Sequence, residues 1–278
     1  MVGIVGITLG PMLASLILSF TNYDLVGGLP DWIGFSNYVK MFTADPRFLT
    51  SAWVTFRYVI VSVPLQLAFA LALALLLNRG IRGLAIYRTV YYLPSLIGSS
   101  VAVAVLWRQV FGGQGLFNQL LGLLGLHNLP SWVATPEHAL TTIIALNVWT
   151  FGSPMIIFLA GLRQIPTELY EAASVDGASS WSKFIRVTIP LLTPVLFFNL
   201  VLQMIHSFQA FTQAYIISGG SGGPVDSTLL YSLYLYQQGF TNFNMGYASA
   251  MAWVLLVAIA LASAIAFGSA KYWVYYED

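Results

Sequence analysis

The sequence contains no cysteine, few charged residues and only three histidines among its 278 residues. Without cysteine it can form neither a disulfide framework nor a thiolate metal site, and it has no cysteine nucleophile. Charged residues make up 8% and hydrophobic residues 58%, whereas globular proteins have about 25% charged residues. So few charges cannot wet the surface of a water-soluble domain, which excludes that class. The formal net charge of +1 also excludes the large basic field that would hold nucleic acid.

The chain has six apolar segments, and each is long enough to form a membrane-spanning helix of about 20 residues. Runs such as residues 65–77 are apolar on every side and lack the alternation of a barrel strand. The sequence therefore predicts an all-α membrane protein with six transmembrane helices, in which residues 1–278 form a single transmembrane domain. The expected spans lie near residues 1–20, 52–77, 89–110, 138–160, 191–212 and 245–268.

The distribution of the cations predicts the orientation, because loops on the cytoplasmic side of a membrane are enriched in lysine and arginine. Seven cations lie between the second and third spans, between the fourth and fifth, or after the sixth, against four elsewhere. The seven are Arg79, Arg82, Arg88, Arg163, Lys183, Arg186 and Lys271. We therefore expect these loops and both termini to be cytoplasmic, and the loops at residues 22–50, 112–137 and 213–244 to face outward.

The sequence has no phosphate-binding loop that ends in Gly-Lys-Ser or Gly-Lys-Thr, so any ATP used must be hydrolysed by another chain. The expected spans also lack paired carboxylates, metal ligands and a Ser/His/Asp set, so neither an enzyme nor a metal site is expected. A self-contained, ion-coupled secondary transporter of a neutral solute is the alternative. Such carriers usually place ionisable residues deep in their spans, and here His206 has no intramembrane carboxylate near it in the sequence.

The most polar stretch of the chain, residues 161–190, joins the fourth and fifth spans and is longer than a tight helical hairpin requires. Its local signals predict a helix, a turn and a second short helix at the membrane surface. They are Pro166 and Thr167 at the start, Gly177 as a left-handed cap, Ser179 or Ser180 as a second start and Pro190 as the end. The loop is either a docking surface for another protein or an interfacial segment that packs on its own bundle.

Within this loop an EAA triplet is followed after three residues by a glycine and after nine more by Val-Thr-Ile-Pro. The residues concerned, with the acidic residue beside the glycine, are Glu171, Ala172, Ala173, Asp176, Gly177 and Pro190. The pattern resembles the EAA loop of binding-protein-dependent ABC importer permeases, whose form ends in Ile-x-Leu-Pro. The resemblance implies the type I permease fold, with this loop as the coupling helix in a cleft of an ATPase subunit. It further implies that Glu171 pairs with a basic residue there.

Longer stretches, at residues 88–121, 147–178 and 239–253, resemble the permeases of sugar importers. The outer loop ISGGSGGP, at residues 217–224, resembles the MalF-type member of a permease pair, although it is longer than the usual Gly-Gly-Pro form. The resemblance implies a subunit that transports sugar by alternating access in a bacterial or archaeal plasma (inner) membrane. The implied partners are a second, MalG-like permease, two ATPase subunits and an extracytoplasmic solute-binding protein. ATP and Mg would be bound by the ATPase subunits, with no cofactor in this chain.

Polar residues recur along the fifth span at spacings of four, three, three and four, which places them on one face of a helix. They are Asn199, Gln203, His206, Gln209 and Gln213. Amides facing lipid would lose their hydrogen bonds at a cost of several kcal/mol, so this face must point toward protein or water. The row either joins neighbouring helices or lines a path for cargo.

A second polar and aromatic cluster, at residues 147–151, lies in the fourth span. In the maltose-type permeases that the chain resembles, the aligned stretches of the fourth and fifth spans line the sugar site. Amides can hydrogen-bond to sugar hydroxyls and aromatic faces can stack on sugar rings, although Trp149 and Phe151 can equally serve helix packing. The candidate path residues are Asn147, Thr150, Phe151, Gln203, His206, Ser207 and Gln209.

Overall fold

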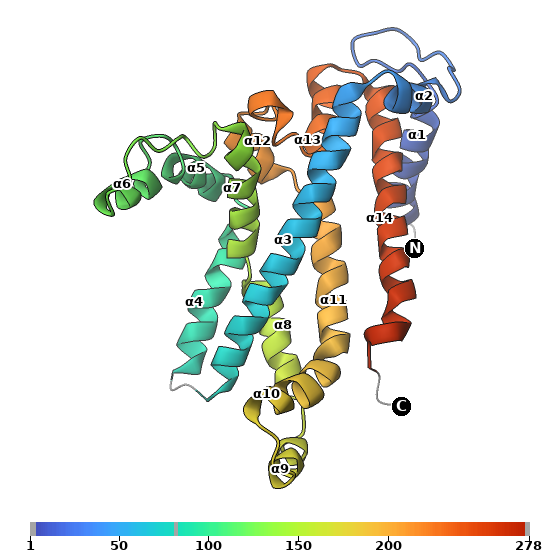
Figure 1. Cartoon of the computed structure of the whole chain (residues 1–278). Coiled ribbons are helices and arrows are strands. Elements are labelled where there is room, and N and C mark those ends of the chain that lie inside the picture. Colours follow the sequence, from blue (N-terminus) through green and yellow to red (C-terminus); the bar gives the residue numbers. More distant parts are fainter. Residues whose placement is uncertain (1–3, 81–82, 276–278) are drawn as a thin grey trace.

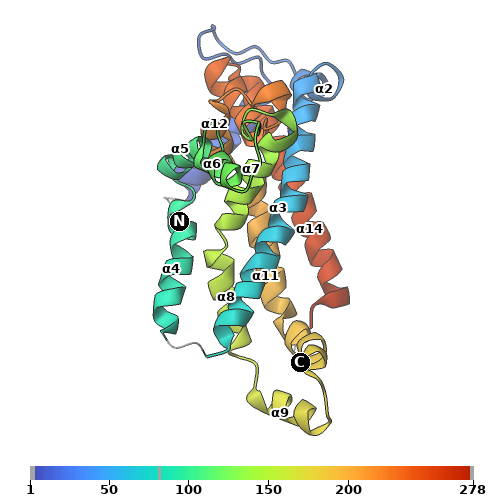
Figure 2. The same cartoon turned by 60° about the vertical axis from the view of Figure 1, so that its left-hand side comes forward.

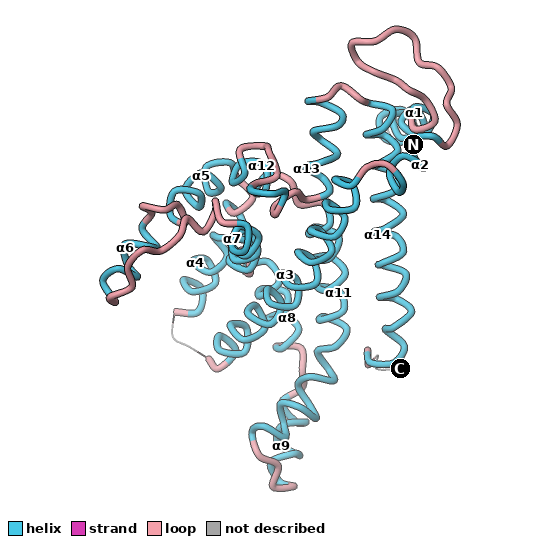
Figure 3. Tube along the Cα trace, turned by 45° about the horizontal axis from the view of Figure 1, so that its top comes forward, coloured by secondary structure: helices cyan, strands magenta, loops and turns pink. Residues whose placement is uncertain are grey.

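The computed structural model describes residues 4–80 and 83–275, and within these ranges every regular element is a helix (Figure 1, Figure 3). An isolated antiparallel bridge joins Thr21 to Trp32. The all-α class predicted from the sequence is therefore confirmed.

The elements follow one another from a mixed π- and α-helical first segment to a long last helix. They are η1 (Ile4–Leu9), α1 (Gly10–Leu18), α2 (Ser36–Thr43), α3 (Pro46–Asn78), α4 (Leu84–Ile97), α5 (Val101–Val110), α6 (Leu116–Leu123), α7 (Pro136–Trp149) and α8 (Gly152–Leu162). There follow α9 (Thr167–Val175), α10 (Ser180–Lys183), η2 (Phe184–Thr188), α11 (Ile189–Phe208), α12 (Thr212–Ser218), η3 (Pro224–Asp226), α13 (Tyr231–Tyr236), η4 (Gln237–Thr241) and α14 (Met245–Trp273).

Three helices are long and apolar enough to cross a membrane: α3, the continuous helix Ser180–Phe208, and α14. The pairs α4 with α5 and α7 with α8 qualify only if each bent pair counts as one span, which makes up to 5 in the described part of the chain. The first apolar segment forms the shorter helix Gly6–Leu18. The expected number of six is reached only by counting both bent pairs and this shorter helix.

The predicted span at residues 89–110 is wrong as a continuous helix, because α4 and α5 meet at 95°. Gly98 caps the end of α4, and Ser100 then takes an extended conformation. The Ser100 hydroxyl accepts a hydrogen bond from the Val103 N–H at 3.3 Å, which starts α5 in a new direction. As a result α5 and α6 lie to the side of the bundle, near the end opposite α9 (Figure 1, Figure 2).

The spans predicted at residues 138–160 and 191–212 also differ from the structure. The first is bent by 42° between α7 and α8. The second ends at Phe208, where the Ser232 hydroxyl donates to the freed Phe208 carbonyl at 3.4 Å. The prediction that Pro190 closes a separate short helix is wrong, because α10 continues through η2 into α11. The wider π-helical turn, closed by the Ile189 N–H on the Phe184 carbonyl, accommodates a proline that cannot donate.

The centre of the bundle is α3, which packs against α7, α8 and α11. Its Ala70 and Ala74 are fully buried, and side chains this small allow neighbouring helices to approach closely. On the other side of the contact, Met155 and Phe158 of α8 are also fully buried. The bent pair α7 and α8 therefore packs directly on α3, and α4 packs in turn against α8.

The start of α8 lies directly against the backbone of α4. A Cβ added at Gly152 would lie 2.5 Å from the Tyr91 carbonyl oxygen and 2.7 Å from the Tyr92 Cα. Neither backbone atom can rotate away, so only glycine fits this contact.

We expect Gly152→Ala to lower the unfolding temperature of the purified protein, because overpacking at such a contact costs about 1–3 kcal/mol. The measurement is thermal unfolding in detergent or nanodiscs. Gly268→Ala in α14 is the matched control, since nothing lies within 4 Å of an added Cβ there. Equal unfolding temperatures for the two variants would contradict the close contact.

Candidate functional site

A cavity of about 500 Å³ lies where the two bent helix pairs meet α3, α11 and the start of α12. Its polar lining consists of five amides, six hydroxyls and one imidazole, and no carboxylate, lysine or arginine is among the lining residues. The polar lining residues are Tyr58, Gln66, Ser95, Ser99, Asn147, Thr150, Ser153, Gln203, His206, Gln209, Thr212 and Gln213. Such a surface can both donate hydrogen bonds to a hydroxyl-rich molecule and accept them from it.

The carbonyl of Thr150, just after α7, is the point at which the cavity walls are joined. Its helical donor would be the N–H of residue 154, but Pro154 has none, and lipid supplies no substitute. Gln66 Nε2 donates to this carbonyl and to the Thr150 hydroxyl, each at 3.1 Å. Ser95 Oγ donates to the same carbonyl at 2.8 Å and accepts from the Ser153 N–H at 2.9 Å. The bend between α7 and α8 is thereby tied to both α3 and α4.

The row of polar residues predicted on the fifth span does not form one helical face. α11 ends at Phe208, so Gln209 follows the helix and Gln213 lies in α12. The turn nevertheless returns both amides to the cavity. Gln213 Nε2 donates to the Gly98 carbonyl at 3.4 Å, at the break between α4 and α5. Asn199 is fully buried and is not a lining residue.

The lining side chains fall into two groups. Gln66, Asn147 and Gln213 hydrogen-bond to other protein groups, and Asn147 Nδ2 donates to Gln66 Oε1 at 3.4 Å. The hydrogen bonds found among the described residues include none made by the side chains of Gln203, His206 or Gln209. The first group joins helices, and the second group is available to a molecule in the cavity.

Most of the predicted path residues come together in this cavity, namely Asn147, Thr150, Gln203, His206 and Gln209. Phe151 does not line it, because its buried ring packs edge-on against Phe69 with centroids 4.9 Å apart. Ser207 is buried at 3% exposure and does not line it either. For Phe151 the structure therefore favours the helix-packing alternative.

The polar lining residues that had not been singled out as path candidates or in the fifth-span row are Tyr58, Gln66, Ser95, Ser99, Ser153 and Thr212. A signal existed for Gln66, which is the only amide in the apolar run at residues 65–77. A weaker signal existed for Ser99, which follows Gly98 and precedes Ser100 within an apolar segment. The other four carry no sequence pattern that separates them from ordinary span residues.

A second candidate site is α9, which projects from one end of the bundle and contains no buried residue (Figure 1, Figure 2). Glu171 and Ala172 are exposed, and Ala173 is half-buried. The alternative of a loop lying flat on its own bundle does not describe this helix. Its surface is open to another protein.

The predicted left-handed cap at Gly177 is confirmed by its φ of +74°. The Gly177 N–H donates to the Ser174 carbonyl at 3.0 Å, and the Ala178 N–H donates to the Ala173 carbonyl at 2.9 Å. This pair of bonds is the Schellman arrangement, which ends α9 sharply after Asp176.

At its start α9 differs from the prediction: Thr167 is the first helical residue and makes no side-chain cap. Of the two serines considered for the second start, Ser179 is the cap, and its hydroxyl accepts from the Ser182 N–H at 3.2 Å. The turn between α9 and α10 thus rests on local hydrogen bonds, at the end of α9 and at the start of α10.

Two side-chain hydrogen bonds attach α9 to the helix that becomes α11. The hydroxyls of Tyr170 and Thr188 lie 3.0 Å apart, and Lys183 Nζ donates to Ser174 Oγ at 2.6 Å. Because η2 runs directly into α11, a displacement of α9 is transmitted to the helix that carries Gln203 and His206.

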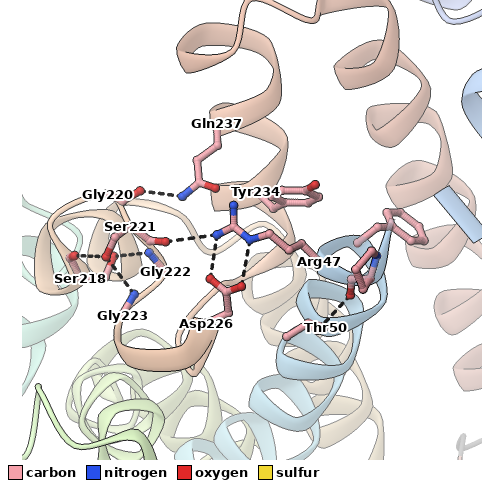
Figure 4. Close-up of polar contacts among 12 residues, drawn as sticks. Arg47, Thr50, Ser218, Gly220, Ser221, Gly222, Gly223, Asp226, Tyr234 and Gln237 are labelled. Carbon is pink, nitrogen blue, oxygen red and sulfur yellow. Dashed lines mark hydrogen bonds and ion pairs between the residues drawn. The ribbon is translucent and has the colours of Figure 1, made fainter. Parts of the chain in front are cut away.

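At the opposite end, the glycine-rich loop between α12 and α13 is held by Arg47, in the first turn of α3 (Figure 4). Arg47 donates to both carboxylate oxygens of Asp226, at 2.7 and 2.9 Å, and to the Ser221 carbonyl at 3.4 Å. Its guanidinium lies 5.3 Å from the centroid of the Tyr234 ring. Burial, together with the 2.7 Å hydrogen bond to Asp45, raises the pKa of Tyr234, which therefore stays a neutral donor. These contacts hold the outer loop in one position.

The sequence matches the family described as "Binding-protein-dependent transport system inner membrane component" over residues 41–273. Among curated proteins it is 54% identical to the probable ABC transporter permease protein YesP of Bacillus subtilis (strain 168), over 100% of this chain and 89% of the relative. It is 34% identical to the lactose transport system permease protein LacF of Rhizobium radiobacter, over 94% of this chain and 88% of the relative.

A third similar protein is the trehalose/maltose transport system permease protein MalF of Thermococcus litoralis, 33% identical over 83% of this chain and 78% of the relative. Among solved structures, a chain of a bacterial alginate ABC transporter, crystallised with an alginate-bound periplasmic protein, superposes with a TM-score of 0.81. The two sequences are 23% identical, over 96% of this chain and 90% of that one. This similarity establishes the fold.

We expect Gln66→Leu to lower the unfolding temperature, because it removes both donations to Thr150 and the acceptor of the Asn147 amide, and each such hydrogen bond contributes about 0.5–1.5 kcal/mol. The measurement is again thermal unfolding of the purified protein. The neighbouring Leu65→Met is the control, since Leu65 is 51% exposed on the bundle surface. An unfolding temperature of Gln66→Leu equal to that of the control would show that the Thr150 junction does not depend on Gln66.

Proposed function

The chain belongs to the family of binding-protein-dependent transport system inner membrane components, and from this membership we propose that it is the permease subunit of an ATP-driven sugar importer. A permease subunit of this family is part of a transporter and is not itself an enzyme. The single observation that carries the sugar assignment is the polar cavity, with its amides and hydroxyls and no formally charged side chain in its lining. Amide groups can donate to and accept from the hydroxyls of a sugar at the same time.

The names of the similar proteins support the same cargo class, since lactose and trehalose/maltose appear in two of them. An ion-coupled secondary transporter is not favoured, because the lining residues include no carboxylate, lysine or arginine. The cavity therefore suits a hydroxylated cargo whose movement is driven from outside the chain.

The coupling surface proposed for the ATPase is the exposed face of α9 around Glu171, Ala172 and Ala173. Its support is the projection of α9 from the bundle, its sharp end at Gly177 and its attachment to α11. We propose that Asp176 and Gly177 shape the end of this surface and that Pro190 lies in the helix it moves. ATP and Mg would be bound by two ATPase subunits, with no cofactor in this chain.

The remaining partners in the proposal are a second, MalG-like permease subunit, which completes the translocation path, and an extracytoplasmic solute-binding protein, which delivers the sugar. The loop held by Arg47 lies at the end away from α9 and is available to that protein (Figure 1, Figure 4). The excess of cations in the loops on the α9 side supports a plasma-membrane location with both termini cytoplasmic.

The test of the proposed function is sugar uptake by proteoliposomes that contain this chain, its partner permease and the ATPase subunits, with the binding protein added outside. Calorimetric titration of the binding protein with mono- and oligosaccharides first identifies the cargo. ATP-dependent uptake of that sugar is the expected result. Uptake that runs on an ion gradient without ATP would overturn the proposal.

We expect Glu171→Lys to release the ATPase subunit during purification of the complex, because the reversed charge repels the basic residue proposed to meet it. Retention of the ATPase is measured on affinity-purified complexes, with the unfolding temperature as the check on folding. Glu168→Lys, in the first turn of the same helix but outside the EAA triplet, is the matched control and should retain the subunit. Full retention and full uptake for Glu171→Lys would remove α9 as the coupling surface.

We expect Gln203→Leu and His206→Leu each to lower the rate of uptake by about fivefold to a hundredfold, as loss of one hydrogen bond worth about 1–3 kcal/mol predicts. ATPase retention should be unchanged, because neither residue lies on α9. Phe198→Leu is the control on the same helix, since Phe198 is 52% exposed on the bundle surface. Unchanged uptake kinetics for both cavity variants would favour the alternative that these residues only join helices.

A further inference from the structure

Asn199, in the middle of α11, is a buried amide without a partner. The residue is 0% exposed, and neither Oδ1 nor Nδ2 of its side chain has a hydrogen-bond partner among the described residues. At membrane depth such a group is costly, because lipid offers no hydrogen-bond partner in place of water. A buried unpaired group in a native structure calls for a functional explanation.

A second permease subunit cannot supply the missing partner in this conformation. Asn199 has no exposed surface even when the chain is taken alone, so another chain cannot reach it. A partner from outside the chain can therefore reach Asn199 only when helices of this chain move apart.

Asn199 lies on the helix that carries the cavity residues Gln203 and His206. It lies one helical turn from Gln203 on the same face of α11, on the side toward α9. α3 and α11 run antiparallel and pack together (Figure 1). Near their outer ends, Thr55 Oγ1 accepts from the Tyr231 N–H and the Phe208 carbonyl accepts from the neighbouring Ser232 hydroxyl.

Counting along the two helices from that shared level brings Asn199 level with the stretch of α3 from Ser62 to Gln66. Ser62 is fully buried there, and Gln66 lines the cavity. The cavity thus reaches this level along α3, and the contact between α3 and α11 that covers Asn199 is closed in this conformation.

α11 has a point at which it can bend below Asn199. Pro194 cannot donate to the Pro190 carbonyl, and the Thr193 hydroxyl donates to that carbonyl instead, at 2.6 Å. On the far side of this point the helix is attached to α9 through the Tyr170 to Thr188 contact. A displacement of α9 can therefore move α11 relative to α3 at the level of Asn199.

We propose that Asn199 is a second hydrogen-bonding position for the cargo, one helical turn from Gln203 along α11, which opens when α9 draws α11 away from α3. The ligand at this position is a hydroxyl group of the transported sugar, to which one amide can both donate and accept. This proposal rests on the proposed function. Asn199 would thus belong to the translocation path although it is fully buried in this conformation.

The first test is thiol labelling of Asn199→Cys in the complete importer. The chain has no cysteine of its own, so the introduced thiol is its only one. N-ethylmaleimide labelling of this chain is compared between the nucleotide-free complex and the complex trapped with ATP and vanadate. We expect labelling in one state and protection in the other, whereas Gln203→Cys marks the cavity and Phe197→Cys, packed between Phe267 and Trp273, stays unlabelled in both. An Asn199→Cys thiol that is unreactive in both states would overturn the proposal.

The second test separates contact with cargo from simple hydration. The sugar identified with the binding protein is added during labelling, and it should slow the reaction of Asn199→Cys in the reactive state. Reaction that is unaffected by the sugar would mean that only water reaches Asn199, and the assignment to the cargo would fall.

The third test compares Asn199→Leu with Asn199→Ser for uptake and thermal unfolding. Leucine removes an unpaired amide, so the unfolding temperature should stay the same or rise while uptake falls about tenfold, and serine should retain more uptake. A lower unfolding temperature with full uptake would show an ordinary structural bond. Failure of the wild-type importer to take up any sugar would refute the proposed function, whereas the labelling pattern without sugar tests the opening at Asn199 separately.

Discussion

A carbonyl freed by a broken helix at membrane depth must accept a hydrogen bond from a side chain, because lipid offers none. The arrangement of this protein depends on that requirement at Thr150, where Pro154 removes the helical donor. Gln66 and Ser95 supply the bonds, and in doing so they bring α3 and α4 to the bend between α7 and α8. In the same way, Gln213 donates a hydrogen bond to the Gly98 carbonyl at the break between α4 and α5. The polar cavity is the space that these donors enclose.

Structural and ligand-facing roles are divided among the lining side chains. Gln66 and Ser95 are already bonded to the backbone and hold the walls, while Gln203 and His206 remain available. The available pair is carried by α11, the helix that is continuous with the attachment of α9. The side chains that bind the walls together and those available to a ligand thus lie on different elements. A transporter that alternates access through movement of one helix against a rigid wall needs this division.

The sequence was sufficient for the class of the fold, for α3 and α14, for the cap at Gly177 and for most of the cavity residues on α7 and α11. It was not sufficient for the breaks, because α4 and α5 together are hydrophobic enough for one span and the turn between them depends on one serine cap. The junction at Thr150 joins residues far apart in the chain, and no local pattern pairs Gln66 with it. For Phe151 the sequence left open whether the ring faces a path or packs between helices, since its place in an apparently continuous helix gave no indication of the bend that turns the ring toward Phe69.

The bend that ends α4 has a consequence for the surrounding bilayer. With 14 residues, α4 is only about 21 Å long at 1.5 Å per residue, against a hydrocarbon core of about 30 Å. α3, with 33 residues, exceeds that thickness amply, so the hydrophobic height differs around the circumference of the protein. α5 and α6 extend sideways above α4 and expose Leu106, Leu120 and Leu123 there (Figure 1). A bilayer of ordinary thickness in contact with α4 would therefore have to thin locally, and it would not have to do so beside α3.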